Sequence, residues 1–463
     1  MSSKKENIIA NNNDSIATTY ASRFFSESIP KHDIPDKGIG SDVAYQIIHD
    51  ELNIDGNPSL NLASFVTTWM DPNAEKLIIE TINKNLVDQD EYPQTGVIRE
   101  RIVNMLARLF NAPGNNQHTG TATVGSSEAI MLGLLAHKWN FRKKMQRLNR
   151  DGSKPNIVIG ADVHIVWEKF ARYFDVEMKI IPMKKGRYIL DVDDVKKNID
   201  ENTICVGAVL GTTFTGQIDP IEEINEMLEN VKKQKGWDIP IHVDGASGGF
   251  IVPFLYPDMK WDFRLSHVKS INVSGHKYGL VYPGIGWLIF KDKTELPEDL
   301  IFYVNYLGGE EATYTLNFSR GSSMMIVQYY NLLMLGKDGY KRIMENTFKN
   351  AVYLLEKIKK IDFLEPVLET IKLPIITTSI KKGAGFDVFQ LSARLKERGW
   401  IVPAYNLPKD AEDVKILRIV IRENFSSDMA DILISDIIRF AKELAGKEHK
   451  ETTPGDSIHK HIC

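Results

Sequence analysis

Two charged residues, Lys277 and Asp244, each follow a short apolar segment that is typical of a buried strand. Lys277 ends the motif Ser-Gly-His-Lys directly after residues 269–273, and Asp244 ends the segment 240–244. In α/β proteins, ligands bind at the carboxyl ends of such strands, where the two side chains would meet. Pyridoxal phosphate needs a lysine to form a Schiff base and a carboxylate to keep its pyridine nitrogen protonated. The pair therefore indicates a pyridoxal phosphate site, against the alternative that Lys277 is a solvated surface lysine.

A candidate phosphate site lies at the start of a strongly helical run, residues 129–144. Small residues and the hydroxyls of Ser126 and Ser127 precede this run. A helix start of this kind presents free backbone N–H groups to an anion, although ordinary N-capping by a serine explains the same residues. The segment is not a P-loop, because no Gly-Lys-Ser/Thr closes it, and no dinucleotide-binding glycine motif follows a predicted strand.

Two further strands end in polar residues that would face the same edge of the sheet. His164 follows the predicted strand 156–161, and its imidazole could lie flat on an aromatic cofactor. Thr213 lies in a polar loop after the predicted strand 203–210. A helix-capping or solvent-facing histidine and a plain turn are the alternatives. The four positions taken together, rather than any one motif, favour pyridoxal phosphate.

Strand and helix patterns alternate through the first two thirds of the chain, which is typical of a mostly parallel sheet covered by helices. Strands are predicted at 156–161, 176–181, 203–210, 239–244, 270–273 and 286–290, and helices at 71–85, 96–111, 129–144, 166–174, 192–199 and 221–235. After a long helical region from 321 to 360, a smaller α+β unit is predicted, with strands 375–380 and 414–421 and helices 387–398 and 427–443.

Composition excludes several classes of protein. The net charge is 57 − 61 = −4, which argues against a dedicated nucleic-acid binder. No apolar run is long enough to span a membrane, and the polar first 15 residues, which we expect to be mobile, do not resemble a signal peptide. Two cysteines, Cys205 and Cys463, form no disulfide framework, and no zinc-ligand spacing occurs. We therefore expect a cytoplasmic protein without a metal ion.

The chain resembles glutamate decarboxylases of the bacterial and plant type, which are group II pyridoxal-phosphate-dependent decarboxylases. The resemblance extends from about residue 20 to about residue 443. The stretches that carry it are 61–69 (Asn-Leu-Ala-Ser-Phe-Val-Thr-Thr-Trp), 82–85 (Ile-Asn-Lys-Asn), 88–93 (Asp-Gln-Asp-Glu-Tyr-Pro), 124–129 (Val-Gly-Ser-Ser-Glu-Ala), 242–249 (His-Val-Asp-Gly-Ala-Ser-Gly-Gly), 274–279 (Ser-Gly-His-Lys-Tyr-Gly) and 306–309 (Tyr-Leu-Gly-Gly). The lysine motif and the Asp-x-Ala-x-Gly pattern alone would fit many fold-type-I enzymes.

The resemblance implies a role for each matching position, with Lys277, His164 and Asp244 as the catalytic residues. The cofactor contacts it implies are Lys277 through a Schiff base, Asp244 at the pyridine nitrogen, Ser126, Ser127 and His276 at the phosphate, Ser319 from a neighbouring subunit, His164 and Ala246 on opposite ring faces, and Thr213 near the ring oxygen or the substrate carboxylate. The substrate contacts it implies are Arg418 for one carboxylate, and Ser64, Phe65, Asn85 and Asp88 for the distal carboxylate. Some bacterial members have glutamine in place of His164 and threonine in place of Ser64.

The resemblance further implies a fold and an activity. The fold is the fold-type-I pyridoxal-phosphate-dependent transferase fold, with a mostly parallel seven-stranded sheet. The implied division is an arm (1–62), a large cofactor-binding domain (63–345), a small C-terminal α+β domain (346–448) and a flexible tail (449–463). The implied reaction converts L-glutamate to 4-aminobutanoate and CO₂ in a homo-oligomer that is at least a dimer, with a hexamer as the alternative.

Other functions remain open from the sequence. One is a decarboxylase or lyase reaction on another amino acid, or an aminotransferase reaction, at the same cofactor site. Another is a non-catalytic oligomeric binding protein on a degenerate enzyme fold. Residues 446–463 contain no tryptophan and show no amphipathic helical pattern in sequence, so we expect no calmodulin binding. His461 or His459 could close the site at neutral pH and release it in acid together with the N-terminal segment, against the alternative of an inert tail.

Overall fold

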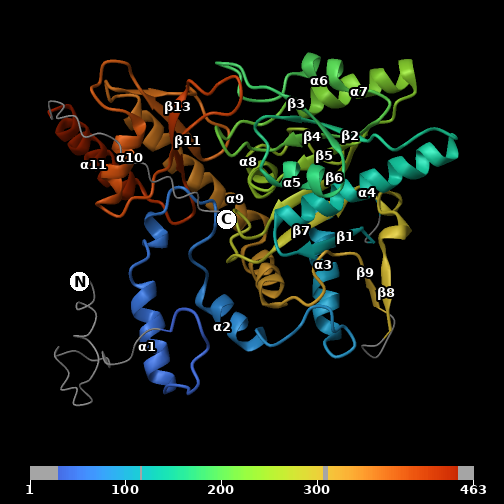
Figure 1. Ribbon diagram of the computed structural model, residues 1–463, viewed down its shortest axis with the longest axis horizontal. Helices are drawn as coiled ribbons and strands as arrows, with labels where there is room; N and C mark the ends of the chain where they lie inside the picture. The colour runs from blue at the N-terminus through green and yellow to red at the C-terminus, as the bar shows by residue number, and fades with distance from the viewer. Residues whose placement is uncertain (1–29, 115–116, 306–310, 447–463) are drawn as a thin grey trace, which may run out of the picture. The chain divides into compact units, whose positions relative to one another are not determined.

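The computed structural model describes residues 30–114, 117–305 and 311–446 (Figure 1). The stretch 306–309 and the histidines His459 and His461 lie outside these residues, as do the first 29 residues. The chain divides into two compact units, residues 1–58 and 59–463. In the first unit, helix α1 (Ser41–Leu52) begins after Gly40 and has no buried residue. This helix falls within the predicted arm, whose limits remain a prediction.

A seven-stranded sheet forms the centre of the second unit, with the strand order β1-β7-β6-β5-β4-β2-β3 (Figure 1). Its strands are β1 (Gly120–Thr123), β2 (Asn156–Gly160), β3 (Glu177–Ile181), β4 (Thr203–Val209), β5 (Ile241–Asp244), β6 (Val268–Ser274) and β7 (Gly286–Phe290). The five strands from β2 to β6 pair in parallel, and only β7 runs antiparallel to its neighbours β6 and β1. The prediction of a mostly parallel seven-stranded sheet is therefore confirmed.

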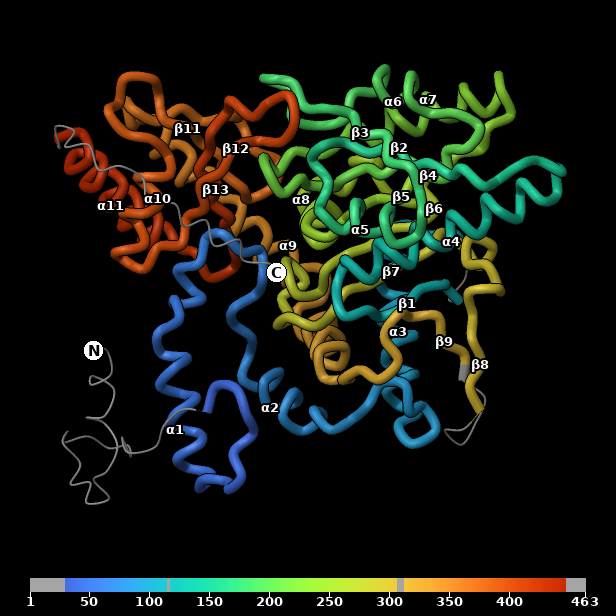
Figure 2. Tube along the Cα trace, in the orientation of Figure 1, coloured from blue at the N-terminus to red at the C-terminus, as the bar shows by residue number. Residues whose placement is uncertain are grey.

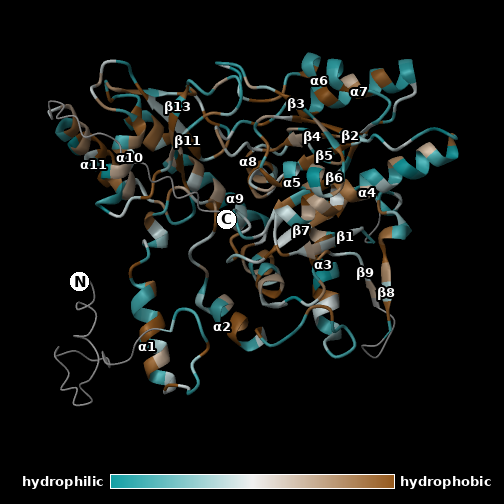
Figure 3. Ribbon diagram, in the orientation of Figure 1, coloured by the Kyte–Doolittle hydropathy of each residue, from teal (hydrophilic) through white to brown (hydrophobic). Residues whose placement is uncertain are grey.

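Helices cover the sheet because its central strands are apolar on both faces. In β2, for example, Val158 packs in one hydrophobic cluster and Ile157 and Ile159 in another. The helices are α2 (Pro72–Thr81), α3 (Pro93–Leu109), α4 (Ser126–Arg147), α5 (Val166–Tyr173), α6 (Val192–Asn198), α7 (Ile221–Lys235) and α8 (Val252–Leu255). Figure 3 shows hydrophobic residues along the strands and hydrophilic stretches on α6 and α7.

A second, antiparallel sheet has four strands in the order β10-β11-β13-β12. Its strands are β10 (Leu364–Pro366), β11 (Ile375–Ile380), β12 (Ala404–Asn406) and β13 (Lys415–Val420), and its helices are α10 (Val388–Lys396) and α11 (Ser427–Ala445). Asp387 begins α10 with a capping box, since its carboxylate accepts from the Gln390 N–H while the Gln390 side chain accepts from the Asp387 N–H. The predicted smaller α+β unit is therefore present.

The long helix α9 (Ser323–Ile358) connects the two sheets (Figure 2). Its first half packs in the core of the large sheet through Met325, and its second half packs in the core of the small one through Leu354. At Gly336 the backbone leaves the helical region with φ 57°, which a glycine adopts without strain. The domain boundary expected after residue 345 falls inside this helix, and the domain limits remain a prediction.

The short strands were not predicted. They are β1, β10, β12 and the hairpin of β8 (Phe302–Val304) and β9 (Glu311–Thr313). Segments this short are too brief for an alternating pattern to stand out. Four single-turn 3₁₀ helices complete the described elements: Pro58–Leu60, Gly248–Phe250, Lys293–Glu295 and Glu298–Leu300. Within the described ranges, no helix is both long and apolar enough to cross a membrane, and no cluster of three or more potential metal-ligating side chains occurs.

Candidate active site

A cavity of about 310 Å³ lies where the parallel strands end. It is lined by residues that follow β2, β4, β5 and β6 and by the first residues of α4. Eight of the residues proposed from the sequence line it: Ser126, Ser127, His164, Thr213, Asp244, Ala246, His276 and Lys277. They converge because carboxyl ends of neighbouring parallel strands meet at one edge of a sheet.

The N-terminus of α4 faces this cavity without a capping side chain. The helix begins at Ser126, one residue earlier than it would with Ser126 as its N-cap, and the N-cap position is held by Gly125, which has no side chain to cap it. A Cβ on Gly286 of β7 would lie 2.5 Å from the carbonyl carbon of Gly125, so the strand approaches the helix start closely. The Ser126 and Ser274 hydroxyls are 2.7 Å apart. Free N–H groups and hydroxyls of this kind suit a phosphate.

Lys277 lies in the cavity, three residues after the end of β6. It is therefore not a solvated surface lysine. It is partly buried, and its Nζ donates a 3.3 Å hydrogen bond to the Ser247 hydroxyl. Burial lowers the pKa of Lys277, which Asp244 opposes by raising it and Arg418 reinforces by lowering it. A lowered pKa makes more of the uncharged, nucleophilic amine available at neutral pH.

Asp244 is buried at the end of β5, and its Oδ1 accepts two hydrogen bonds. One comes from the Asn272 side-chain amide at 3.0 Å and the other from the Ala246 N–H at 3.1 Å. Both hydrogen bonds fix the orientation of the carboxylate. The carboxylate, the Lys277 amine and the uncapped helix N-terminus are the groups that pyridoxal phosphate needs, so the residues present fit this cofactor.

Two histidines line the cavity in defined orientations. The Val166 N–H, at the start of α5, donates to His164 Nδ1 at 3.3 Å, so the neutral ring carries its proton on Nε2. Burial lowers the pKa of His164, and Asp244 opposes this by raising it. His276 Nδ1 lies 2.8 Å from the Ile285 carbonyl and donates to it, because a carbonyl accepts only. Its Nε2 is therefore the nitrogen left for a ligand.

Phe65 and Arg418, two of the residues proposed for the substrate, lie near Lys277, and Ser64 precedes Phe65 in the chain. The Phe65 ring centre is 5.1 Å from Lys277 Nζ. Arg418, on β13 of the small sheet, donates to the backbone carbonyls of Thr213 at 2.9 Å and Ala63 at 2.6 Å. The Ser64 hydroxyl accepts from the Val66 N–H at 3.1 Å. The small sheet and the segment 63–65 are thus joined to the cavity edge.

Asn85, Asp88 and Ser319 form a separate cluster. The Asn85 side-chain amide donates to Asp88 at 3.2 Å and to the Ser319 hydroxyl at 3.5 Å, and its oxygen accepts from the Arg320 N–H at 2.9 Å. None of the three residues lines the cavity around Lys277, and Ser319 lines a second cavity of about 340 Å³. Within one chain, the structure does not bring these three residues to the lysine.

Asp162 is a cavity residue that was not proposed from the sequence. It is buried, and its Oδ2 has no hydrogen-bond partner within the described part of the chain. Burial raises the pKa of Asp162 well above its usual range, and the nearby Asp219 and Asp244 raise it further. Its position two residues after the end of β2 and two residues before His164 could have indicated it from the sequence.

Comparison with known proteins agrees with this geometry. A family model described as the pyridoxal-dependent decarboxylase conserved domain matches residues 33–381. A glutamate decarboxylase of Solanum lycopersicum is 51% identical over 94% of this chain and 87% of the relative. One of Aliivibrio fischeri is 47% identical over 92% of each chain.

Solved structures resemble the whole fold. The Lactobacillus brevis CGMCC 1306 glutamate decarboxylase has a TM-score of 0.89 at 41% identity, and the match covers 92% of this chain and 97% of the other. The Oryza sativa TDC structure with PLP and tryptamine, at 17% identity and a TM-score of 0.74 over 89% of this chain and 90% of the other, shares the fold. The chain belongs to the pyridoxal-dependent decarboxylase family.

Proposed function

We propose that this protein decarboxylates L-glutamate to 4-aminobutanoate and CO₂, with pyridoxal phosphate bound through Lys277. The observation that carries the proposal is the joining of Lys277, Asp244 and the uncapped N-terminus of α4 in one cavity of about 310 Å³. The names of the plant and bacterial relatives, which are glutamate decarboxylases at 45 to 51% identity, support the substrate.

Each part of the cofactor has a matching group in the cavity. The α4 N-terminus with Ser126, Ser127 and His276 would hold the phosphate, Asp244 the pyridine nitrogen, and His164 and Ala246 the ring faces. When bound, the cofactor supplies an electron sink for the pair released as the Cα–carboxylate bond breaks.

The chain's own residues bind the substrate and move protons. The lowered pKa of Lys277, caused by burial, leaves its Nζ able to act as a nucleophile and to accept a proton. The same Nζ, or His164 through its Nε2 proton, returns a proton to Cα after CO₂ has left. Arg418 holds a substrate carboxylate through a charge-assisted hydrogen bond. The Phe65 ring packs against both Lys277 and Arg418.

Asn85, Asp88 and Ser319 would complete the site of a second copy, so the active form is at least a dimer. The second cavity, which Ser319 and Ile82 line, supports this proposal. Next to it, α2 and α9 pack together and leave Ile79, Ile82, Leu333 and Met334 exposed. An exposed apolar surface of this kind is typical of a subunit interface.

The compartment is proposed from cysteine usage. The chain has two cysteines in 463 residues, and Cys205 is a buried free thiol in β4. This usage fits a reducing compartment such as the cytoplasm.

The test is a decarboxylation assay with glutamate, aspartate, tyrosine and DOPA from about pH 4 to 8, a range set by the ionisation of histidine and carboxyl groups. We expect CO₂ release from glutamate alone, and none from Lys277→Ala. Release from another of these amino acids but not from glutamate would favour the alternative of a different decarboxylase. A purified protein that never takes up pyridoxal phosphate would contradict both and favour a non-catalytic binding protein.

A further inference from the structure

A continuous row of buried polar side chains runs along β5 and β6 and ends at Asp244. It begins at His137 on α4 and passes through Ser270 on β6, His242 on β5 and Asn272 on β6. The successive distances are 2.7 Å from His137 Nε2 to Ser270 Oγ, 2.6 Å on to His242 Nδ1, 2.9 Å from His242 Nε2 to Asn272 Oδ1, and 3.0 Å from Asn272 Nδ2 to Asp244 Oδ1. None of the five residues is more than 5% exposed.

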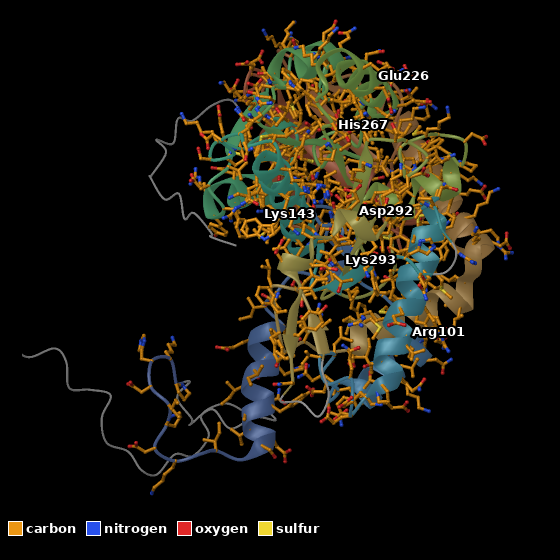
Figure 4. All side chains as sticks on the ribbon, turned by 90° about the vertical axis from the view of Figure 1, so that its right-hand side faces the viewer. Arg101, Lys143, Glu226, His267, Asp292 and Lys293 are labelled. Atoms are coloured by element: carbon orange, nitrogen blue, oxygen red, sulfur yellow. The ribbon has the colours of Figure 1, made fainter. Side chains whose placement is uncertain are left out.

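Strand register builds this row. Ser270 lies opposite His242, and Asn272 lies opposite Asp244, in the pairing of β6 with β5. His137 lies near the amino ends of these strands, where it lines a cavity of about 1310 Å³. Lys143 and Lys293, which also line this cavity, are labelled in Figure 4. A Cβ on Gly133 of α4 would lie 2.8 Å from His242 Cε1, so the helix packs directly on the imidazole. The register of β5 and β6 and the close approach of α4 therefore fix the positions of these side chains.

The chemistry of the end group sets the direction of every hydrogen bond. An ionised Asp244 only accepts, so the Asn272 amide donates to it and the Asn272 oxygen faces His242. His242 must then donate from Nε2, which leaves its Nδ1 to accept from the Ser270 hydroxyl. The Ser270 oxygen in turn accepts from His137 Nε2. All donors point toward Asp244.

Both imidazoles are neutral, as this arrangement requires. Burial, with smaller contributions from His242 and Lys269, lowers the pKa of His137 to about 3. Burial lowers the pKa of His242 to about 4, against the raising effects of Asp244 and Asn272. The row does not conduct protons, because the Asn272 side-chain amide does not transfer a proton from its oxygen to its nitrogen. It is an aligned set of dipoles, and aligned hydrogen bonds strengthen one another.

We infer that Asn272, His242 and Ser270 are positioning residues that hold the Asp244 carboxylate in a fixed orientation toward the cofactor ring. Asn272 acts directly, since its side-chain amide donates a hydrogen bond to Asp244 Oδ1. His242 fixes which way the amide faces, and Ser270 fixes the tautomer of His242. The inference rests on the proposed role of Asp244 at the pyridine nitrogen. Its consequence is that groups behind the carboxylate control how tightly the cofactor is bound.

The first test measures the dissociation constant of pyridoxal phosphate from the full-length enzyme by equilibrium dialysis. We expect Asn272→Leu to weaken binding by about tenfold or more, the usual effect of losing a hydrogen bond to a charged group. Ser270→Ala leaves the contacts of Asp244 in place and should weaken binding roughly twofold to fourfold, through lost polarisation alone.

Asn156→Leu is the matched control. Asn156 is a buried asparagine of the same sheet whose amide also donates to an aspartate, Asp200, at 2.8 Å, away from the cavity. This variant should lose stability in denaturant without a change in cofactor affinity. If Asn272→Leu binds the cofactor as tightly as Asn156→Leu does, the inference is wrong. If the wild-type protein binds no cofactor at all, the proposed function fails instead.

The second test does not measure activity, and it does not substitute any residue that contacts Asp244. Nitrogen-15 spectra of protein labelled at histidine report which ring nitrogen carries the proton, and His137→Phe identifies one signal by its loss. We expect neutral rings protonated at Nε2 for both His137 and His242. A His242 protonated at Nδ1, or a charged His242 at neutral pH, would reverse or break the row and overturn the inference.

Discussion

The guanidinium carbon of Arg418 lies 5.2 Å from the centre of the Phe65 ring. The same ring lies 5.1 Å from Lys277 Nζ, so one aromatic side chain contacts both cations. The segment that carries Phe65 is tied to the lysine loop as well, since the Thr67 hydroxyl donates to the Lys277 carbonyl at 2.6 Å. Segment 63–67, the small sheet and the lysine therefore hold one another in place.

We expect Arg418 to contribute to substrate binding and Arg422 to the stability of the fold. Arg422 donates to the carbonyls of Val66 and Asn61 and to the Thr68 hydroxyl, whereas Arg418 donates to the carbonyl of Thr213, which lines the cavity around Lys277. We expect Arg418→Lys to lower kcat/KM for glutamate by about tenfold or more, because lysine cannot reproduce the forked geometry. Arg422→Lys should instead lower the free energy of unfolding by about 1–3 kcal/mol. Steady-state kinetics and denaturant unfolding of both variants check this, and equal kinetic losses would contradict it.

Mixing two inactive variants tests whether Asn85 acts across a subunit interface. In a hybrid of Lys277→Ala and Asn85→Ala subunits, one site keeps both a lysine and a partner's asparagine if Asn85 reaches the neighbour. We therefore expect the co-expressed variants to regain activity that neither homo-oligomer shows. If Asn85 served the site of its own chain, every hybrid site would lack one of the two groups and activity would stay absent.

Asp162→Asn should change how stability depends on pH. Burial raises the pKa of Asp162 above its unfolded value of 3.8. Between those two pKa values the folded state keeps a proton that the unfolded state has lost, so this group's contribution to stability falls as pH rises. Asparagine has no such proton. The variant should gain stability relative to wild type from about pH 4 upward, measured by urea unfolding across pH. A constant difference at all pH values would show that Asp162 titrates normally.

Gly207→Ala should destabilise the large sheet. Gly207 lies in β4, and an added Cβ would lie 2.4 Å from Trp167 Cη2 and 2.9 Å from Ile159 Cγ2. Overpacking of this kind costs about 1–3 kcal/mol, and the smaller ring in Gly207→Ala/Trp167→Phe should recover part of it. Gly38→Ala is the control, because an added Cβ there meets nothing within 4 Å. Thermal unfolding of the three variants measures the effect.

Local patterns were enough to predict the central elements. The predicted strand 203–210 and helix 221–235 agree with β4 and α7 within one residue, since apolar periodicity and flanking breakers are local properties of the chain. The convergence of Lys277, Asp244 and His164 also followed from sequence, because parallel strands place their carboxyl ends together. The row behind Asp244 was not predicted, although the sequence contains a pattern that indicates it. Ser270, Asn272 and Ser274 are polar at alternate positions of a buried strand.

By itself, the sequence determined the alternation of strands and helices, the family and the residues that follow each strand. Tertiary structure alone decided which distant side chains meet. Arg418 reaches Ala63 across 355 positions of the chain, and Asn272 reaches Asp244 only because β6 pairs with β5 in one particular register. The physical reason is that periodicity records which face of an element is buried, whereas a hydrogen bond between elements depends on register and packing, which no local pattern records.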